Sequence, residues 1–150
     1  KLLVSELSGH YADPTAMVQA DALLIDIAGR QRMLTQKMSK ESCMISAGLG
    51  DADTIAKLTG TMNMFETSLT ALRFGMSAAG ILPPPSTQIE TGLLVVQDDW
   101  KKVKPLLDIV ASGGTLDPDA KKNKFQLLNL TMADMNKVVG QYSTTAKGTN

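Results

Sequence analysis

A basic segment in the first quarter of the chain carries the residues best suited to bind an anion. Gly29, Arg30 and Arg32 stand close together there. An arginine guanidinium is planar and always charged, and it donates two parallel hydrogen bonds to an oxyanion. A glycine in mid-helix costs about 1 kcal/mol relative to alanine, and the close approach of a backbone or a ligand is the usual compensation. This segment therefore suggests a site for a small planar oxyanion.

The spacing of these residues predicts a distinct helix face. Residues three or four positions apart share one face of a helix. Mostly small or polar residues follow that spacing at Ile25, Gly29, Arg32, Gln36, Ser39 and Cys43. Arg30 points about 160° away from Arg32, because successive residues turn by about 100°. We expect this face to meet something outside the helix, and the simpler alternative is a solvated arginine beside a tolerated glycine.

Pairing of two copies of this helix would make the face an anion site. Across a twofold axis, the two Arg32 side chains would oppose each other over the gap left by Gly29. Two such charges about 6 Å apart repel by about 3 kcal/mol at an effective dielectric constant near 20, and an anion between them reverses the sign. We therefore expect a homodimer through the first helix, with the anion at its interface.

The elements that must position this face are four helices. Apolar residues recur at spacings of three and four in four segments, which predicts helices over residues 14–48, 52–79, 87–112 and 118–146. The first stripe has Gln31 at a position where an apolar residue is expected. The predicted core positions are Met17, Ala20, Leu24, Ile27, Leu34, Met38 and Ile45 in the first helix; Ile55, Leu58, Met62, Phe65, Leu69, Leu72 and Met76 in the second; Ile89, Leu93, Val96, Trp100, Val103, Leu107 and Val110 in the third; and Phe125, Leu128, Met132, Met135, Val139 and Tyr142 in the fourth.

The connections between these segments carry matching signals. Proline follows an aspartate at residues 13–14 and 117–118, and Thr87 with Glu90 fits a capping box. Gly48, Gly80 and Gly113 stand where left-handed C-caps belong. Short connections make neighbouring helices antiparallel, so the predicted fold is all-α, an antiparallel up-down bundle of four long helices. We expect residues 1–150 to form one such domain, with no clear assignment for residues 1–12.

Composition excludes several classes of function. Fifteen basic and fifteen acidic residues cancel, so the chain lacks the broad positive charge that nucleic acid binding needs. A single cysteine, Cys43, closes no intrachain disulfide. No apolar run reaches the roughly 18 residues of a membrane span. Because the chain begins at Lys1, we expect it to be a part of a longer protein.

An enzymatic role is not expected. The only histidine, His10, precedes the first predicted helix, which also argues against a histidine phosphotransfer bundle. The sequence has no Glu-x-x-His pair for a di-iron bundle, no haem attachment motif, and no nucleophile with an evident base. We expect no metal and no cofactor.

The segment of residues 25–38, IDIAGRQRMLTQKM, resembles the signature of the PilJ-type sensor domain. That family comprises the N-terminal domains of type IV pili methyl-accepting chemotaxis transducers. The resemblance covers residues 20 to 142, and it continues through residues 69–73, 82–85 and 135–139, which read LTALR, LPPP and MNKVV. The core of the first motif, Ala28-Gly29-x-x-Arg32-Met33, is also similar to the ligand-binding box of nitrate and nitrite sensor histidine kinases.

The resemblance implies a periplasmic four-helix bundle, taken from between two transmembrane helices of a membrane-anchored parent protein. Its first helices pair and bind one nitrate on the twofold axis. Carried over by position, Gly29 allows close approach and backbone contact, and Arg32 clamps the anion. Ile25, Ala28 and Gln36 belong to the same predicted site. Arg30 and Gln31 depart from the histidine-kinase pattern and agree with the PilJ-type one, and we expect Arg30 to be a secondary contact.

The predicted function is therefore that of the ligand-binding domain of a chemoreceptor that senses a small anion. Nitrate is the first ligand to consider, because nitrate sensing is a specialisation among chemoreceptors with this domain. The alternative is a sensor domain, of a chemoreceptor or a histidine kinase, that responds to a protein such as a pilin and binds no small molecule.

Overall fold

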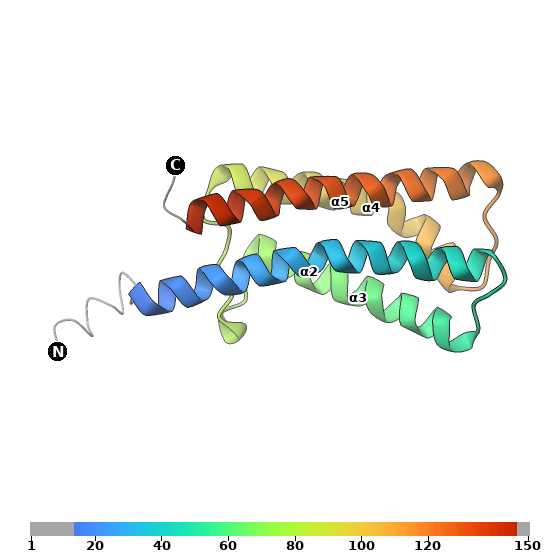
Figure 1. Cartoon of the computed structure of the whole chain (residues 1–150), viewed down its shortest axis with the longest axis horizontal. Helices are drawn as coiled ribbons and strands as arrows, with labels where there is room; N and C mark the ends of the chain where they lie inside the picture. The colour runs from blue at the N-terminus through green and yellow to red at the C-terminus, as the bar shows by residue number, and fades with distance from the viewer. Residues whose placement is uncertain (1–13, 147–150) are drawn as a thin grey trace.

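The computed structural model describes residues 14–146, which form four long helices and one short 3-10 turn. The helices are α2 (Pro14–Ser46), α3 (Ala52–Phe74), α4 (Thr87–Ala111) and α5 (Pro118–Ala146), and the turn is η1 (Ser77–Ala79). Successive long helices run in opposite directions along one axis, as Figure 1 shows. The prediction of an all-α, antiparallel up-down bundle is confirmed. The interpretation of residues 1–12 lies outside the described residues.

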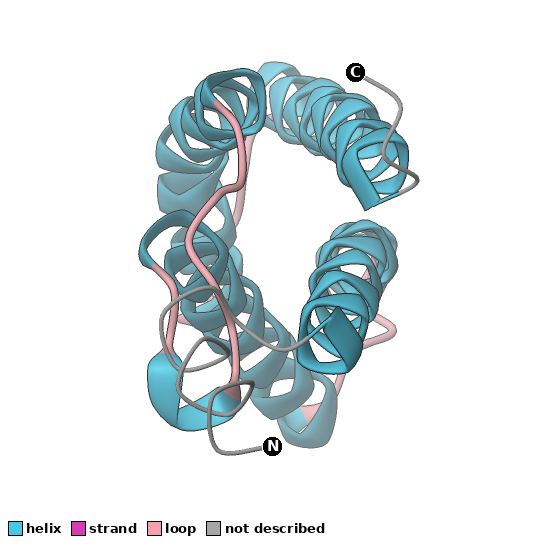
Figure 2. Ribbon diagram, turned by 90° about the vertical axis from the view of Figure 1, so that its left-hand side faces the viewer, coloured by secondary structure: helices cyan, strands magenta, loops and turns pink. Residues whose placement is uncertain are grey.

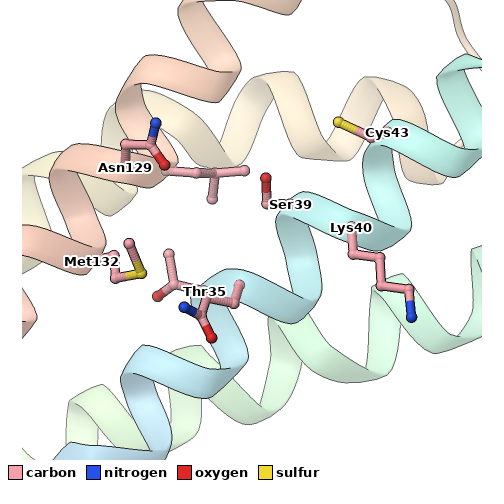
Figure 3. Close-up of a pocket in the computed structure, with 8 residues that line it drawn as sticks. Thr35, Ser39, Lys40, Cys43, Asn129 and Met132 are labelled. Atoms are coloured by element: carbon pink, nitrogen blue, oxygen red, sulfur yellow. The ribbon is translucent and has the colours of Figure 1, made fainter.

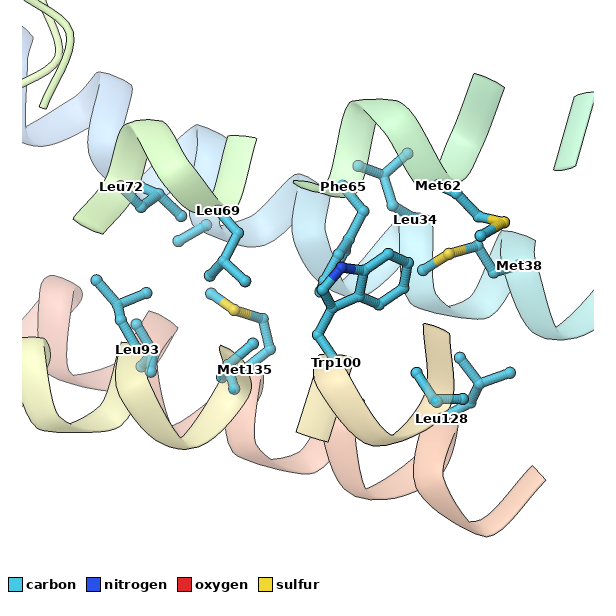
Figure 4. Close-up of a cluster of buried hydrophobic side chains, with 14 of the residues drawn as sticks. Leu34, Met38, Met62, Phe65, Leu69, Leu72, Leu93, Trp100, Leu128 and Met135 are labelled. Atoms are coloured by element: carbon cyan, nitrogen blue, oxygen red, sulfur yellow. The ribbon is translucent and has the colours of Figure 1, made fainter. Parts of the chain in front are cut away.

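The four helices are arranged around a common axis, as the view along the bundle shows (Figure 2), and their buried apolar side chains form one core. Phe65 of α3 and Trp100 of α4 meet at its centre, with ring centroids 4.7 Å apart and planes tilted by 43°. Leucine and methionine side chains from all four helices fill the space around them (Figure 4). All seven core positions predicted for α4 are buried, from Ile89 to Val110. This helix shows the cleanest agreement between apolar spacing and burial.

The second helix ends earlier than its apolar spacing predicts. Residues 52–79 were expected to be helical, but α3 stops at Phe74, and Met76 is 41% exposed. Gly75 adopts a φ of 76°, and a Cβ there would lie 2.9 Å from the backbone nitrogen of Pro83. Gly80 caps η1, not α3, with a φ of 74°. The return of the chain across Gly75 therefore ends the helix, despite the apolar residue that follows.

The N-cap of α4 is also displaced by one residue. Ser86, not Thr87, has the extended backbone of an N-cap, and its Oγ accepts a hydrogen bond from the Ile89 backbone N–H at 3.2 Å. All four predicted helix starts, at residues 14, 52, 87 and 118, agree with the structure. The predicted start at residue 118 has a visible cause, because Asp117 Oδ1 accepts from the Ala120 N–H at 2.7 Å.

On α5, the buried face differs from the predicted one. Phe125 is 50% exposed, and Met132 and Val139 are only partly buried. The preceding residues, Lys124, Thr131 and Val138, are buried instead. These residues continue a spacing of three and four with Leu128, Met135 and Tyr142, so the periodicity was correct and the polar members were missed.

Hydrogen bonds satisfy some of the buried polar side chains, on α5 and on the other helices. Lys124 Nζ donates to Ser42 Oγ at 2.9 Å, and Thr61 Oγ1 donates to Glu41 Oε1 at 2.9 Å. Gln31, with no exposed surface, donates from Nε2 to the backbone oxygen of Phe65 at 3.0 Å. Its expected place on the apolar stripe is confirmed, and the bond explains how a polar side chain is tolerated there.

None of the described helices combines the length and apolar character that crossing a membrane requires.

Candidate ligand-binding site

The face of α2 singled out above borders a shallow groove against α5. A depression of about 350 Å³ there is lined by Gly29, Arg32, Met33, Gln36, Met132 and Asn136. Arg32 and Gln36 are exposed, and Ile25 and Gly29 are partly buried. The structure therefore brings three of the predicted site residues, Gly29, Arg32 and Gln36, to one open surface.

Arg32 reaches across this groove to the last helix. Its Nη1 donates to Asn136 Oδ1 at 2.5 Å, between residues 104 positions apart in the chain. Among residues 14–146, no carboxylate forms a salt bridge with the Arg32 guanidinium. The bond to an amide oxygen leaves the positive charge of Arg32 intact, because the acceptor is neutral.

Arg30 lies in a different environment, as its angle on the helix predicts. Its Nη2 is 3.1 Å from Asp26 Oδ2, one turn earlier on α2, and both side chains are more than half exposed. Such an exposed pair contributes little to stability, but it offsets the charge of Arg30 locally. Arg30 does not line the groove that contains Arg32.

Gly29 has open space where a side chain would be. A Cβ built at this position meets no other heavy atom within 4 Å. Packing within the single chain therefore does not require a glycine here. Gly60 of α3 and Gly140 of α5 have the same open space, so this feature identifies a ligand site only together with the neighbouring Arg32.

Two other predicted residues face the protein interior. Ala28 has no exposed surface and belongs to the apolar core, and Ile25 is partly buried and packs against the core. Ala28 lies one helical turn before Arg32, but its side chain is buried in the core, where its small size serves helix packing.

A second depression continues the groove along α2 and α5. It also measures about 350 Å³ and shares Gln36 and Met132 with the first. Figure 3 shows Asn129 and Met132 of α5 across from Thr35 and Ser39 of α2, while the Lys40 side chain points away. Cys43, a free thiol, lies exposed at its edge. The predicted face therefore extends as a polar groove over several turns of α2.

Sequence reasoning missed Asn136 and Met132 as groove residues. Asn136 stands within residues 135–139, which carried part of the family resemblance. Met132 was assigned to the core, and it is partly buried at the groove floor. No signal in the sequence told which face of α5 would oppose Arg32.

The opposite side of α5 holds a buried pair of acids. Asp99 of α4 is 4% exposed, and its Oδ2 has no hydrogen-bond partner within the described residues. Burial above all, and then the hydrogen bond to Asp134 and the charge of that residue, raises the pKa of Asp99 to about 7. A protonated Asp99 carboxyl donates this hydrogen bond. The pair holds a proton within the α4–α5 interface.

The described residues contain no group of three or more histidine, cysteine, aspartate or glutamate side chains arranged to hold a metal ion.

Comparison with known proteins now places this bundle in a class, that of chemoreceptor ligand-binding domains. A solved structure described as the ligand-binding domain of the Pseudomonas aeruginosa nitrate receptor McpN superposes with a TM-score of 0.71 at 26% identity. The match covers 81% of this chain and 94% of that one. The methyl-accepting chemotaxis protein McpN of P. aeruginosa is 31% identical over 87 residues, which are 58% of this chain and 16% of the receptor. The chain thus corresponds to a small part of that curated relative.

The family model described as "Type IV pili methyl-accepting chemotaxis transducer N-term", PilJ, matches residues 15–125. The chain belongs to this family, which confirms the resemblance drawn from residues 25–38. The matched segment contains the entire α2 face, including Gly29 and Arg32, but stops before Asn136.

Proposed function

We propose that this chain is the periplasmic ligand-binding domain of a membrane-anchored bacterial chemoreceptor, and that it senses nitrate or a similar small oxyanion at a homodimer interface. The observation that carries the proposal is the exposed Arg32 guanidinium, which is charged, lacks an acidic partner in the described chain, and lies one turn from the open side of Gly29. The likeness to the ligand-binding domain of a nitrate receptor supports nitrate as the first ligand to test.

In the proposed dimer, two α2 helices pair through the face of Ile25, Gly29, Arg32 and Gln36. Gly29 lets the backbones approach, and the two Arg32 side chains donate to one anion on the twofold axis. Arg30, held by Asp26, acts at longer range. A planar anion suits this arrangement, since each guanidinium offers two parallel donors.

Binding would act on the dimer through linkage. An anion that binds only the paired form stabilises it by about 2.7 kcal/mol at a hundred times its dissociation constant. That free energy is sufficient to favour a helix shift of about 1–2 Å, which is typical of signalling at subunit interfaces. In a membrane-anchored parent protein, α2 and α5 would pass such a shift to the membrane.

The second candidate is a sensor that binds a protein such as a pilin subunit and no small ligand. The exposed Met33, at 64%, favours it, because a large apolar side chain beside a polar groove suits a protein contact as well as an anion site. The two functions differ in their response to a small anion.

Titration calorimetry and sedimentation velocity separate these functions. We expect heat on addition of nitrate or nitrite, none with chloride at equal ionic strength, and a ligand-dependent shift from monomer to dimer. A protein that remains monomeric at all concentrations, with and without nitrate, would contradict the interfacial site.

A further inference from the structure

One hydrogen bond joins the two helices that flank the candidate groove. Arg32 Nη1 of α2 donates to Asn136 Oδ1 of α5, and both residues line the same depression. An exposed arginine otherwise samples many side-chain rotamers, and much of that freedom is lost when a ligand immobilises it. A hydrogen bond to a neighbouring helix already orders the side chain in the free protein, so less conformational entropy is lost when the ligand binds.

The chemistry of the acceptor distinguishes Arg32 from the other arginine of the motif. Arg30 pairs with the carboxylate of Asp26, which offsets its charge. Arg32 bonds to an amide oxygen, which orients the guanidinium and leaves its full charge. A carboxylate at position 136 would give the same orientation but would compete with an anion for the charge.

The geometry also leaves donors for a ligand. A guanidinium has five N–H groups in a fixed fork, and the bond to Asn136 uses one of them, on Nη1. Within residues 14–146, no other hydrogen bond or ion pair of Arg32 joins it to the protein. The edge formed by Nη2 and Nε can thus make a bidentate contact while Nη1 stays on α5.

We propose that Asn136 is a positioning residue for the Arg32 anion site. It holds the guanidinium through Nη1 and presents the remaining edge, still fully charged, to the ligand. The inference rests on the proposed anion-binding function of Arg32 and extends the site from α2 to α5.

Three variants test this role by nitrate calorimetry, with thermal unfolding measured in parallel. Asn136→Ala removes the acceptor, and we expect about three- to tenfold weaker binding, the range for one net hydrogen bond. Asn136→Asp keeps the acceptor and adds a charge, so we expect at least tenfold weaker binding with an unchanged or higher Tm. Asn123→Ala, at an exposed asparagine of α5 that lines neither depression, is the matched control and should bind like the unmodified protein.

The alanine variant separates positioning from a merely structural role. If the bond only joined α2 to α5, its removal in the Asn136→Ala protein would lower the Tm and leave nitrate affinity unchanged. Normal affinity in either Asn136 variant would therefore overturn the proposal.

A ligand-free measurement keeps this proposal distinct from the proposed function. In the unmodified protein, the ¹⁵N relaxation of the Arg32 Nε–H group should show an ordered side chain, and Asn136→Ala should release it while Asn123→Ala should not. Absence of any nitrate or nitrite binding, with this order present, would reject the proposed ligand and retain the positioning. A mobile Arg32 in the unmodified protein would reject the positioning itself.

Discussion

Two polar clusters lie on opposite sides of α5. They differ in whether the ionisable side chain stays charged or is neutralised. Asn136 faces α2 and holds an exposed arginine, whereas Asp134 faces α4 and meets a buried acid. The two residues are two positions apart, which turns them by about 200° around the helix. On the α2 side, Arg32 keeps its full positive charge at the surface. On the α4 side, the raised pKa of Asp99 lets this carboxyl retain a proton, which removes its negative charge.

This difference separates a group available to a ligand from one that serves the fold. Burial and the neighbouring Asp134 raise the pKa of Asp99, so below about pH 7 this buried carboxyl carries no charge that a ligand would have to neutralise. The Arg32 guanidinium has one neutral partner, and the glycine beside it has open space. A charge that the chain leaves uncompensated, next to a missing side chain, is the better indication of a binding site.

Removal of the arginine should have the largest effect. Arg32→Ala is expected to abolish measurable nitrate binding, because the principal charge is lost. Arg32→Lys should recover little, since a point charge replaces the planar fork. Arg30→Ala should lose less, because Asp26 already offsets that charge. Titration calorimetry on the three variants measures this order, and full affinity in Arg32→Ala with loss only in Arg30→Ala would reverse the assignment of the face.

Filling the space at Gly29 should have the next largest effect. Gly29→Leu is expected to weaken nitrate binding and ligand-dependent dimerisation by at least tenfold, because the added side chain separates the paired helices. Gly29→Ala should raise helix stability by up to about 1 kcal/mol while it weakens binding to a smaller extent. Since a Cβ at position 29 meets nothing within the chain, the fold of the monomer should survive both changes.

Circular dichroism and sedimentation on the same samples keep these effects apart. A Gly29→Leu protein with native helicity, normal nitrate affinity and normal dimerisation would show that close approach at Gly29 plays no part in the site.

The acid pair should have the smallest effect on nitrate binding, because it acts on the pH dependence of stability instead. With the pKa of Asp99 raised to about 7 from an ordinary 3.8, the folded protein holds a proton in this interval that the unfolded chain has released. Stability from this group is therefore greatest at low pH, and it falls by up to about 1.4 kcal/mol per pH unit as pH rises through the interval. Above about pH 7 the contribution is constant.

Asp99→Asn should remove this component of the pH dependence, because the amide donates to Asp134 at every pH. The groups around the pair are Asp98 and Lys102 on α4 and Lys137 on α5, the last 4.0 Å from Asp134. Asp98→Asn, at an exposed neighbour, is the control and should retain the slope. Urea unfolding at pH 5 and pH 8 measures how the free energy of unfolding changes with pH. The contrast between the two sides of α5 would be wrong if this change were equal in the Asp99→Asn and unmodified proteins. It would also be wrong if Asp99→Asn altered nitrate affinity.

The apolar spacing was sufficient for much of this structure. All seven core positions of α4 were predicted, as were the starts of α2 and α5 and the antiparallel order of the helices. The exposed face of Gly29, Arg32 and Gln36 and the opposite orientation of Arg30 also followed from spacing alone. Each of these properties belongs to a single helix, whose period of 3.6 residues is set by its backbone.

Contacts between helices decided the rest. Buried Lys124 of α5 donates its hydrogen bond to Ser42 of α2, and Gly75 ends α3 because Pro83 returns across it. Asn136 accepts a hydrogen bond from Arg32, and Asp134 lies beside Asp99, because α5 is rotated so that these two residues face α2 and α4, respectively. The period of a helix shows which residues share a face, but only the packed bundle decides which face each neighbour presents and whether a polar side chain there finds a partner.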